Sequence, residues 1–432
     1  MQMQSSVSST GRATHVTGPG RAVQASSTRT LPIDRWLLRV FLRVAGSPSI
    51  RCELPNGEAV YVGSGDPVGT VRFCDRRALY RTMLQPELAF GECVTDGSIE
   101  ADGDLVTVLD AAFSRQPHPL AERWLFRAQR PRANSLRGSR DNIHSHYDLG
   151  NDFYRLWLDE HMVYTCAYFP TPDATLEEAQ VAKMHHVCRK VALRPGEQVV
   201  EAGCGWGSLA LHMARHYGVT VRAFNISHEQ IAYGREQAAR QGLSDRVEFI
   251  EDDYRNITGT YDCFMSVGML EHVGPSNYRQ FGAVIDRCLR KHGRGLLHTI
   301  GRNRSIRLNA WMEKHIFPGG HPPTLRQMMH ILEPYRFSVL DVENIRLHYE
   351  RTGAHWLQRF EQHVDDVARM FDERFVRAWR LYLASVVATF RNGQMQLFQL
   401  TFARDRFNGI PWTRQGKATR TPAASAEFSR TA

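Results

Sequence analysis

The chain carries the stretch Glu201-Ala202-Gly203-Cys204-Gly205-Trp206-Gly207 directly after a strand-like run at 197–200. A sharp turn from strand to helix needs glycines, because glycine accepts positive φ angles and lets the backbone approach a ligand closely. A dinucleotide fingerprint would place its third glycine at position 208, where this chain has a serine. The glycines instead alternate, with an acidic residue ahead of them. The stretch therefore predicts a ligand-binding turn at a strand end, in a form that differs from the dinucleotide one.

Strand-like and helix-like segments alternate around this stretch. The strand-like runs lie at 197–202, 219–225, 246–251, 261–267 and 294–300, each separated from the next by a plausible helix. That alternation predicts an α/β fold with a parallel, doubly wound sheet. From 355 to about 391 the pattern is helical. Its large apolar residues at helix spacing, interpreted as packing residues, are Trp356, Phe360, Val364, Val367, Phe371 and Phe375.

Polar residues follow the second and third strand-like runs. In Rossmann-type sheets an acid near the end of the second strand usually holds ribose hydroxyls. The missing acid here argues against a generic dehydrogenase, and the alternating glycines after an acid are the form used by class I methyltransferases for S-adenosylmethionine. After the third run, a carboxylate beside an aromatic could accept from an adenine amino group and stack on the ring; an ordinary acidic turn is the other interpretation. The predicted cofactor contacts are Gly203, Gly205, Gly207, Asn225, Ser227, Gln230, Asp253, Tyr254 and Arg255.

The net charge of +9 does not by itself indicate a nucleic-acid partner. Residues 1–30 and 413–432 each contribute +3, so the 382 residues between them are nearly balanced. One basic run remains between 123 and 140; it is either a solvated linker or a contact for anionic lipid headgroups. Eight scattered cysteines without metal-ligand spacing are interpreted as reduced, mostly buried thiols, and no metal is expected.

The pattern divides the chain into five parts. Residues 1–30 and 413–432 are expected to be disordered tails, and 121–140 an arginine-rich linker. Residues 31–120 are expected to form a small α+β domain with strands in 50–54, 59–64 and 69–75. Its first helix is expected to be capped by Asp34 and to pack through Trp36, Leu37, Val40, Phe41 and Val44. Residues 141–412 are expected to form the catalytic domain.

Several segments together resemble the cyclopropane-fatty-acid-synthase family of S-adenosylmethionine-dependent lipid methyltransferases, which includes the mycolic acid cyclopropane synthases. They occur in family order over about 141–412, while residues 31–120 look, more loosely, like the extra domain of the phospholipid-acting members. The resemblance implies a class I methyltransferase fold, a Rossmann-like doubly wound sheet with helical insertions. The matching segments are 146–154 (His-Tyr-Asp-Leu-Gly-Asn-Asp-Phe-Tyr), 164–169 (Tyr-Thr-Cys-Ala-Tyr-Phe), 201–207, 269–274 (Met-Leu-Glu-His-Val-Gly), 298–301 (His-Thr-Ile-Gly) and 316–320 (Ile-Phe-Pro-Gly-Gly).

The resemblance also implies the reaction and its residues. Members of the family add a methylene bridge from S-adenosylmethionine across a cis double bond, and a bound bicarbonate removes a proton from the added methyl so that the ring closes. Carried onto this sequence, the bicarbonate cage would be Cys166, Glu271, His298 and Tyr349 with the backbone of Ile300. Tyr164 and Thr165 would reach the methionine carboxylate of the cofactor. The rings of Tyr168 or Phe169 could stabilise the developing cation.

Other functions fit the sequence less well. The nearest rival is a related lipid C-methyltransferase that gives a methyl-branched or methylene fatty acid. A small-molecule N-methyltransferase would not need the base cage, because an amine is already nucleophilic. A nucleic-acid amino-methyltransferase would show an Asn/Asp-Pro-Pro-aromatic turn after the fourth strand, where this chain has residues 268–272 (Gly-Met-Leu-Glu-His). A lipid-binding protein without activity would have lost cage residues.

The partners and location follow from the same reasoning. The substrate is expected to be an unsaturated acyl chain, most simply in membrane phospholipid, met at an anionic bilayer surface; no nucleic-acid partner is expected. Because no window holds some 18 apolar residues and no signal peptide is visible, the expected location is the cytoplasm, peripheral to the inner leaflet of the cell membrane. Family members of this layout tend to form dimers, so a homodimer is an expectation from the resemblance.

Overall fold

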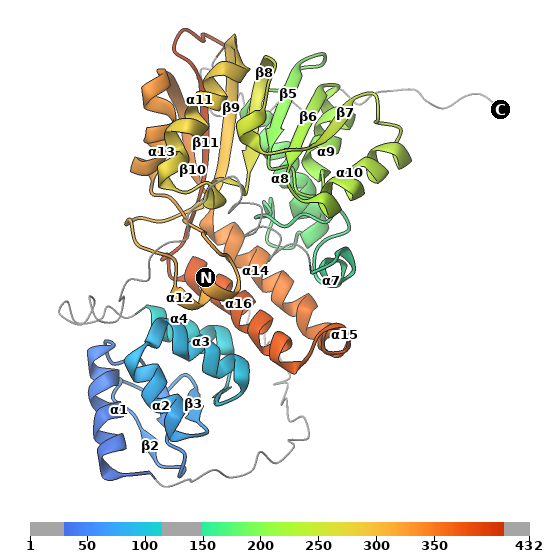
Figure 1. Cartoon of the computed structure of the whole chain (residues 1–432). Coiled ribbons are helices and arrows are strands. Elements are labelled where there is room, and N and C mark those ends of the chain that lie inside the picture. Colours follow the sequence, from blue (N-terminus) through green and yellow to red (C-terminus); the bar gives the residue numbers. More distant parts are fainter. Residues whose placement is uncertain (1–29, 115–148, 410–432) are drawn as a thin grey trace, which may run out of the picture.

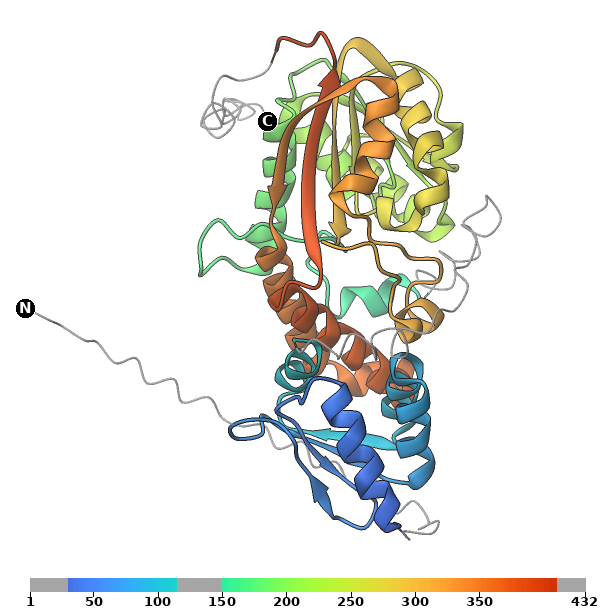
Figure 2. The same ribbon diagram turned by 90° about the vertical axis from the view of Figure 1, so that its left-hand side faces the viewer.

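The computed structural model describes residues 30–114 and 149–409 of the 432-residue chain. The predicted tails (apart from Thr30), the arginine-rich linker at 121–140 and the first residues of the 146–154 segment lie outside the described residues. The proposed domain boundaries stay predictions. The described residues form a large α/β body and a smaller α+β unit, with a group of helices between them (Figures 1 and 2).

A seven-stranded sheet in the order β10-β11-β9-β8-β5-β6-β7 is the centre of the large body. Strands β9, β8, β5, β6 and β7 are parallel neighbours, whereas β11 is antiparallel to both β9 and β10. The predicted doubly wound sheet and its five strand-like runs are confirmed; the sequence missed β10 and β11. The strands are β5 (Gln198–Ala202), β6 (Thr220–Asn225), β7 (Val247–Glu251), β8 (Tyr261–Val267), β9 (Leu289–Gly301), β10 (Phe337–Asn344) and β11 (Gln396–Arg404).

Helices cover both faces of this sheet (Figure 2). Successive strand residues point to opposite faces, so Val199 belongs to the core beneath α8, α9 and α10, and Val200 to the core beneath α11 and α13. The helices are α8 (Leu176–Lys190), α9 (Ser208–Tyr217), α10 (His228–Arg240), α11 (Tyr278–Cys288) and α13 (Leu325–Leu332). Four 3₁₀ turns lie in the connections: η1 (Tyr254–Asn256), η2 (Leu270–His272), η3 (Pro275–Asn277) and η4 (Glu333–Tyr335).

Among residues 30–114, the smaller unit is a four-stranded sheet in the order β2-β1-β3-β4 with four helices. Its strands are β1 (Arg51–Glu53), β2 (Ala59–Val60), β3 (Thr70–Phe73) and β4 (Ile99–Asp102). Its helices are α1 (Pro32–Val44), α2 (Arg76–Leu84), α3 (Pro86–Asp96) and α4 (Leu105–Phe113). The predicted α+β character is confirmed, with strands shorter than the runs suggested.

The predicted packing of α1 is only partly right: Leu37 and Phe41 pack against the core, whereas Trp36 and Val40 are exposed. The helix begins one turn earlier than expected, with Leu31 as its N-cap, and Asp34 lies in the first turn and accepts from the Leu31 backbone N–H at 2.8 Å. The helix buries Leu38 and Leu42, whereas Trp36 is 60% exposed. Because α1 carries two apolar stripes, periodicity alone could not tell which one faces the core.

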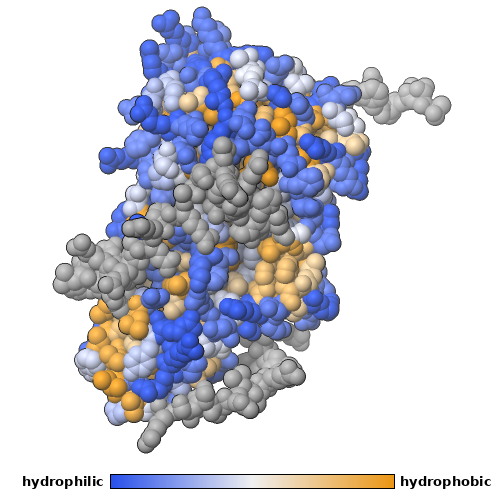
Figure 3. All heavy atoms as spheres, viewed as in Figure 1, coloured by the Kyte–Doolittle hydropathy of each residue, from blue (hydrophilic) through white to orange (hydrophobic). Residues whose placement is uncertain are grey.

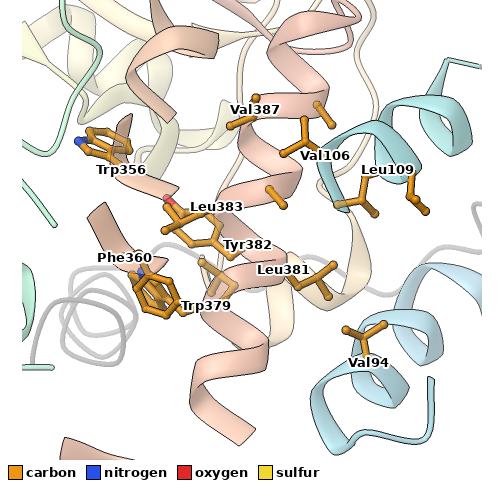
Figure 4. Packing of buried hydrophobic residues seen from close by; sticks show 14 of the residues in the cluster. Val94, Val106, Leu109, Trp356, Phe360, Trp379, Leu381, Tyr382, Leu383 and Val387 are labelled. Atoms are coloured by element: carbon orange, nitrogen blue, oxygen red, sulfur yellow. The ribbon is translucent and has the colours of Figure 1, made fainter. Parts of the chain in front are cut away.

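Helices α14 (Arg346–Gln362), α15 (Val364–Met370) and α16 (Glu373–Arg391) join the two parts. Figure 4 shows that α16 is sandwiched: Trp379 and Tyr382 point toward α14, and Leu381 points toward Val94 of α3. One hydrophobic cluster runs from Leu38 in α1 through these helices to Leu397 in β11. The smaller unit therefore shares its core with the large α/β body. The short helices α7 (Asn151–Arg155) and α12 (Ala310–His315) complete the fold.

A close contact fixes α3 against α12. A Cβ atom on Gly91 would overlap the Trp311 ring, so only glycine lets these two elements approach so closely. Beside it, the Glu92 carboxylate accepts from Lys314 Nζ at 2.7 Å. Within the described ranges, no helix combines the length and apolar character needed to cross a membrane.

Candidate active site

The glycine stretch forms the turn from β5 into α9, and all three of its glycines have positive φ values of 82°, 54° and 89°. A Cβ on Gly203 would lie 2.7 Å from Met269 Cβ, and one on Gly207 would overlap the Phe249 ring. A Cβ on Gly205 would meet no atom within 4 Å. Two of the glycines are therefore explained by packing, and Gly205 borders open space at the carboxyl end of β5. This is where a doubly wound sheet binds its ligand.

Asn225 connects the glycine turn to the next strand end. Its Nδ2 donates to the Gln230 side chain at 2.7 Å and to the Gly205 carbonyl at 3.3 Å. Ser227 is fully buried, and its hydroxyl caps α10 by accepting from the Gln230 backbone N–H. The structure thus brings the predicted residues of β5 and β6 together, and it gives Ser227 a structural role as a cap.

The residues after β7 are largely satisfied by one another. Asp253 accepts from the Arg255 backbone N–H at 2.9 Å and forms an ion pair with its guanidinium at 3.2 Å. The Tyr254 ring is buried, with the edge of Phe281 at 5.2 Å and the Arg255 guanidinium 5.0 Å from its centroid. Internal partners therefore occupy much of the Asp253 carboxylate and of the Tyr254 ring. The contacts of these residues with adenine stay predictions.

The segment Tyr164-Thr165-Cys166 lies at the same edge of the sheet. A Cβ on Gly268, which follows β8, would be 2.7 Å from Thr165 Cγ2. The Tyr164 hydroxyl lies 2.6 Å from that of Tyr382 on α16. The cofactor-binding prediction for the first two residues is therefore compatible with their position, and α16 reaches the site through a phenol.

Sequence reasoning missed a buried lysine beneath this segment. Lys183 on α8 is 1% exposed, and its Nζ donates to Thr165 Oγ1 at 3.0 Å. Burial lowers its pKa to about 8, while the carboxylates of Asp159 and Glu201 oppose that shift. Burial also raises the pKa of Glu201 to about 8. The available signal was a lysine placed among the apolar positions of an amphipathic helix, where the other residues are core.

Cys166 is a buried thiol. It is 0% exposed, its Sγ donates to the Ala167 carbonyl at 3.1 Å, and burial raises its pKa far above the ordinary value. The neighbouring Ala167 N–H donates to Thr352 Oγ1 of α14 at 3.0 Å. Because the thiolate is the nucleophilic form, this cysteine suits hydrogen bonding rather than covalent catalysis.

Glu271 and Ile300 are in direct contact. The backbone N–H of Ile300 donates to Glu271 Oε1 at 2.5 Å, whereas the buried Oε2 has no hydrogen-bond partner in the part of the chain that the structure describes. Burial raises the Glu271 pKa to about 7, and the Ile300 hydrogen bond opposes that shift. An unsatisfied buried carboxylate oxygen is costly, so it indicates a place for a ligand donor.

His298 presents a second unsatisfied atom. It lies on β9 opposite Gln399 of β11, whose Nε2 is 3.1 Å from His298 Nδ1. Burial lowers the His298 pKa well below its usual value, so the ring is neutral. With the amide donating to Nδ1, the proton lies on Nε2, which is buried and has no partner among the described residues. The site thus offers a hydrogen-bond donor near the Glu271 strand contact.

Tyr349 lies on α14, one turn before Thr352, and is 7% exposed. Its ring stacks on Phe390 at 4.4 Å and meets the edge of Trp356 at 5.8 Å. These contacts join the five predicted cage residues into two groups. In the first, Glu271 bonds Ile300, and His298 is two residues before Ile300 on the same face of β9. In the second, Cys166 is linked to the Tyr349 helix through Ala167 and Thr352.

The aromatic faces expected to stabilise a cation are already covered. Tyr168 is stacked between His186 at 4.2 Å and His348 at 4.7 Å. Phe169 stacks against His355 at 5.5 Å and carries the Arg351 guanidinium 4.6 Å from its centroid. Both rings therefore have neighbours on their faces, and their role toward a cation stays a prediction. The rings nearer the Tyr164 side are those of Tyr154, Trp157, Trp206 and Trp356, which form one aromatic group.

All eight cysteines are free thiols, and seven of them are buried. Among residues 30–114 and 149–409, no group of three or more His, Cys, Asp or Glu side chains has the geometry to hold a metal ion.

Comparison with known proteins places the chain among lipid-modifying methyltransferases. The mycolic acid cyclopropane synthetase family profile matches residues 134–400. The chain is 38% identical over 341 residues to the cyclopropane-fatty-acyl-phospholipid synthase of Escherichia coli, covering 76% of this chain and 86% of that one. It is 33% identical over 391 residues to the tuberculostearic acid methyltransferase of Mycobacterium tuberculosis, covering 85% and 90%.

A solved structure gives the same assignment. The mycolic acid cyclopropane synthase in complex with SAH and CTAB superposes with a TM-score of 0.59 at 28% identity, over 61% of this chain and 98% of that one. SAH, S-adenosylhomocysteine, is what S-adenosylmethionine becomes after it gives up its methyl group. The glycine turn, the sheet order and these matches agree. The chain therefore belongs to the mycolic acid cyclopropane synthetase family and is a class I methyltransferase that uses S-adenosylmethionine.

Proposed function

We propose that the chain transfers a methylene group from S-adenosylmethionine to the cis double bond of an unsaturated fatty acyl chain in membrane phospholipid, forming a cyclopropane ring, with bicarbonate as the base. The observation that carries this proposal is the pair of buried unsatisfied atoms, Glu271 Oε2 and His298 Nε2. One is an acceptor and the other a donor, which is the pairing a bicarbonate ion requires, since it carries both a hydroxyl and oxyanion oxygens.

The chemistry explains why such a site is needed. The alkene π electrons attack the sulfonium methyl, the S–C bond breaks, and positive charge is left on the acyl chain. Removal of a proton from the added methyl lets its carbon close the ring. Bicarbonate, when bound, supplies the base for that proton. Water must be kept out, because it would capture the cation as an alcohol.

The chain's own residues would hold and orient the base. The neutral His298 Nε2–H donates a hydrogen bond, the Cys166 thiol and Tyr349 phenol are further groups that can orient an oxyanion, and Glu271 Oε2 accepts from the bicarbonate hydroxyl. Burial supports the exclusion of water, because Cys166 is 0%, His298 2% and Glu271 8% exposed. The name of the E. coli relative supports a phospholipid substrate. Such a substrate places the enzyme at the inner leaflet as a peripheral protein.

A related product is the second candidate. The Mycobacterium tuberculosis relative that matches 85% of this chain is named a methyltransferase rather than a cyclopropane synthase. The same cation could lose a different proton to give a methylene chain, and a separate hydride donor would be needed to reduce that product to a methyl branch. The acceptor and donor pair favours ring closure, because it provides for a base beside the added methyl.

The test is mass spectrometry and proton NMR of fatty acids from a host that lacks its own synthase, with and without this chain. Cyclopropanation predicts that monounsaturated chains gain the mass of one CH₂, lose their olefinic protons and show upfield ring protons. Glu271→Gln should remove the product, whereas Glu236→Gln, an exposed substitution on α10, should not. An exomethylene or methyl-branch signal would support the second candidate and contradict the base assignment. No change in any lipid would contradict the proposed function.

A further inference from the structure

Helix α1 carries an apolar stripe on its outward face. The stripe consists of Ile33, Trp36, Val40 and Val44, which follow one another at spacings of three, four and four residues, whereas the neighbouring Leu37 packs against the core. Ile33 is 52% exposed, Trp36 60% and Val40 37%. Figure 3 shows the resulting hydrophobic surface at the lower left, over the unit that contains α1.

The stripe is not part of the fold of its own unit. A different face of α1 packs inward through Leu38 and Leu42. The buried Asp34 fixes that orientation, because it accepts from Arg76 at 2.8 and 3.0 Å and from the Tyr80 hydroxyl at 2.6 Å. The outward stripe is thus held rigidly toward the exterior, and a large exposed apolar face on a soluble unit indicates a binding surface.

A row of arginines runs beside the stripe. Arg35, Arg39 and Arg43 follow at intervals of four, so they share one face of the helix. Arg35 pairs with Glu58 at 2.5 Å. Arg39 and Arg43 have no carboxylate within ion-pair distance among the residues the structure describes. Their charge is therefore available to an external anion.

We propose that α1 docks this face on an anionic lipid bilayer, with the stripe inserted at the boundary between headgroups and acyl chains and the arginine row on the lipid phosphates. An amphipathic helix with an apolar face and flanking arginines lies in the plane of the interface, and tryptophan prefers that depth. The inference rests on the proposed function in one respect: a phospholipid substrate supplies the reason for docking.

A second copy of the chain is the weaker occupant. A 13-residue helix is roughly 20 Å long, and a stable dimer usually buries about 800 Å² on each partner, more than one helix face provides. Pairing two copies of α1 through their stripes would also place arginine rows near one another. A bilayer surface has the opposite charge and no such size requirement.

The experiment is co-sedimentation of the full chain with vesicles of phosphatidylcholine alone and of phosphatidylcholine with phosphatidylglycerol. We expect strong binding only to the second. Val40→Glu should weaken it by about tenfold or more, because a charge would enter the apolar interface. The matched control is Val339→Glu, a valine 41% exposed on β10, which should bind like the wild type. Arg39→Glu with Arg43→Glu should weaken binding by about tenfold per reversed charge, whereas Arg326→Glu on α13 should not.

The depth to which Trp36 inserts into the bilayer is measured with brominated phosphatidylcholine included in the anionic vesicles. Tryptophan fluorescence of the wild type should be quenched, and Trp36→Phe, which keeps the stripe apolar, should bind as well but lose most of that quenching. Unchanged binding by Val40→Glu would overturn the proposal. So would a wild-type dimer that Val40→Glu converts to a monomer. Because sedimentation needs no turnover, a chain that binds vesicles through α1 but modifies no lipid would contradict only the proposed function.

Discussion

Replacing a glycine of the β5–α9 turn by alanine should have different effects at two neighbouring positions. At Gly207 it should mainly lower stability, and at Gly205 it should mainly weaken cofactor binding. At Gly207 an alanine would have φ near 89° and its Cβ would overlap the Phe249 ring. The left-handed backbone costs about 1–2 kcal/mol and overpacking about 1–3 kcal/mol, so Gly207→Ala should lose about 2–5 kcal/mol of stability. At Gly205 only the backbone cost of about 1–2 kcal/mol applies, because the Cβ meets nothing within 4 Å.

The two variants should also differ in how tightly they bind the cofactor. The open space beside Gly205 is where the methionine end of the cofactor is expected to pass. A Cβ there should weaken binding of S-adenosylhomocysteine by at least about tenfold, which corresponds to about 1.4 kcal/mol. Gly207→Ala should bind nearly normally once folded, because its clash lies on the packed side of the turn.

The assay is urea unfolding with and without S-adenosylhomocysteine. Saturating ligand at about 100 times its Kd stabilises a protein by about 2.7 kcal/mol. Gly207→Ala should begin from the lower midpoint and keep this increment, whereas Gly205→Ala should begin closer to the wild-type midpoint and lose much of the increment. If Gly205→Ala keeps the full increment, or unfolds at lower urea than Gly207→Ala, the assignment of the open side of the turn is refuted.

Three further outcomes follow from the buried groups and the contact between units. Burial raises the Glu271 pKa to about 7, so between about pH 4.5 and pH 7 the folded state keeps a proton that the unfolded state releases. The stability of the wild type should therefore fall as the pH rises through this range. Glu271→Gln should show no such fall, and in urea unfolding at pH 8 it should be more stable than the wild type by about 2–3 kcal/mol. Lys183→Met should weaken cofactor binding about tenfold, as measured by calorimetry. The Lys183 ammonium donates to the Thr165 oxygen and cannot accept the hydroxyl proton, so it leaves that proton free to be donated to a ligand. Equal affinity of the variant and the wild type would contradict this role. Gly91→Ala should lower stability by about 2–4 kcal/mol, since its Cβ would overlap Trp311, while S-adenosylhomocysteine affinity remains unchanged.

The sequence predicted the parallel part of the sheet because each of those strands is an apolar run that ends at a turn. It missed β10 and β11, since polar residues interrupt both. Gln399 is such a residue: it lies in the core of β11 because His298 on the neighbouring strand is its partner. That pairing depends on strand order, which single-strand patterns do not contain.

The candidate site was predictable where the residue pattern is seldom found in other structural roles, as with the alternating glycines of the β5–α9 turn. Lys183 was missed because a lysine at helix spacing usually lies on the surface. The outward stripe of α1 was assigned to the core because Trp36 and Val40 have the same periodicity as the buried Leu38 and Leu42. The choice between two apolar stripes on one helix is made by tertiary contacts, here the anchoring of Asp34 by Arg76.

The sandwiched position of α16 has a consequence for how such proteins can gain or lose parts in evolution. The face of α16 that packs against α3 and α4 includes Leu381 (Figure 4). If those two helices were deleted, this apolar face would be exposed to water. A homologue without the smaller unit must therefore carry hydrophilic residues at the positions that face it, or shield them by other means. Reading the residue that corresponds to Leu381 in an unfamiliar relative should tell whether that relative was built to carry the extra unit.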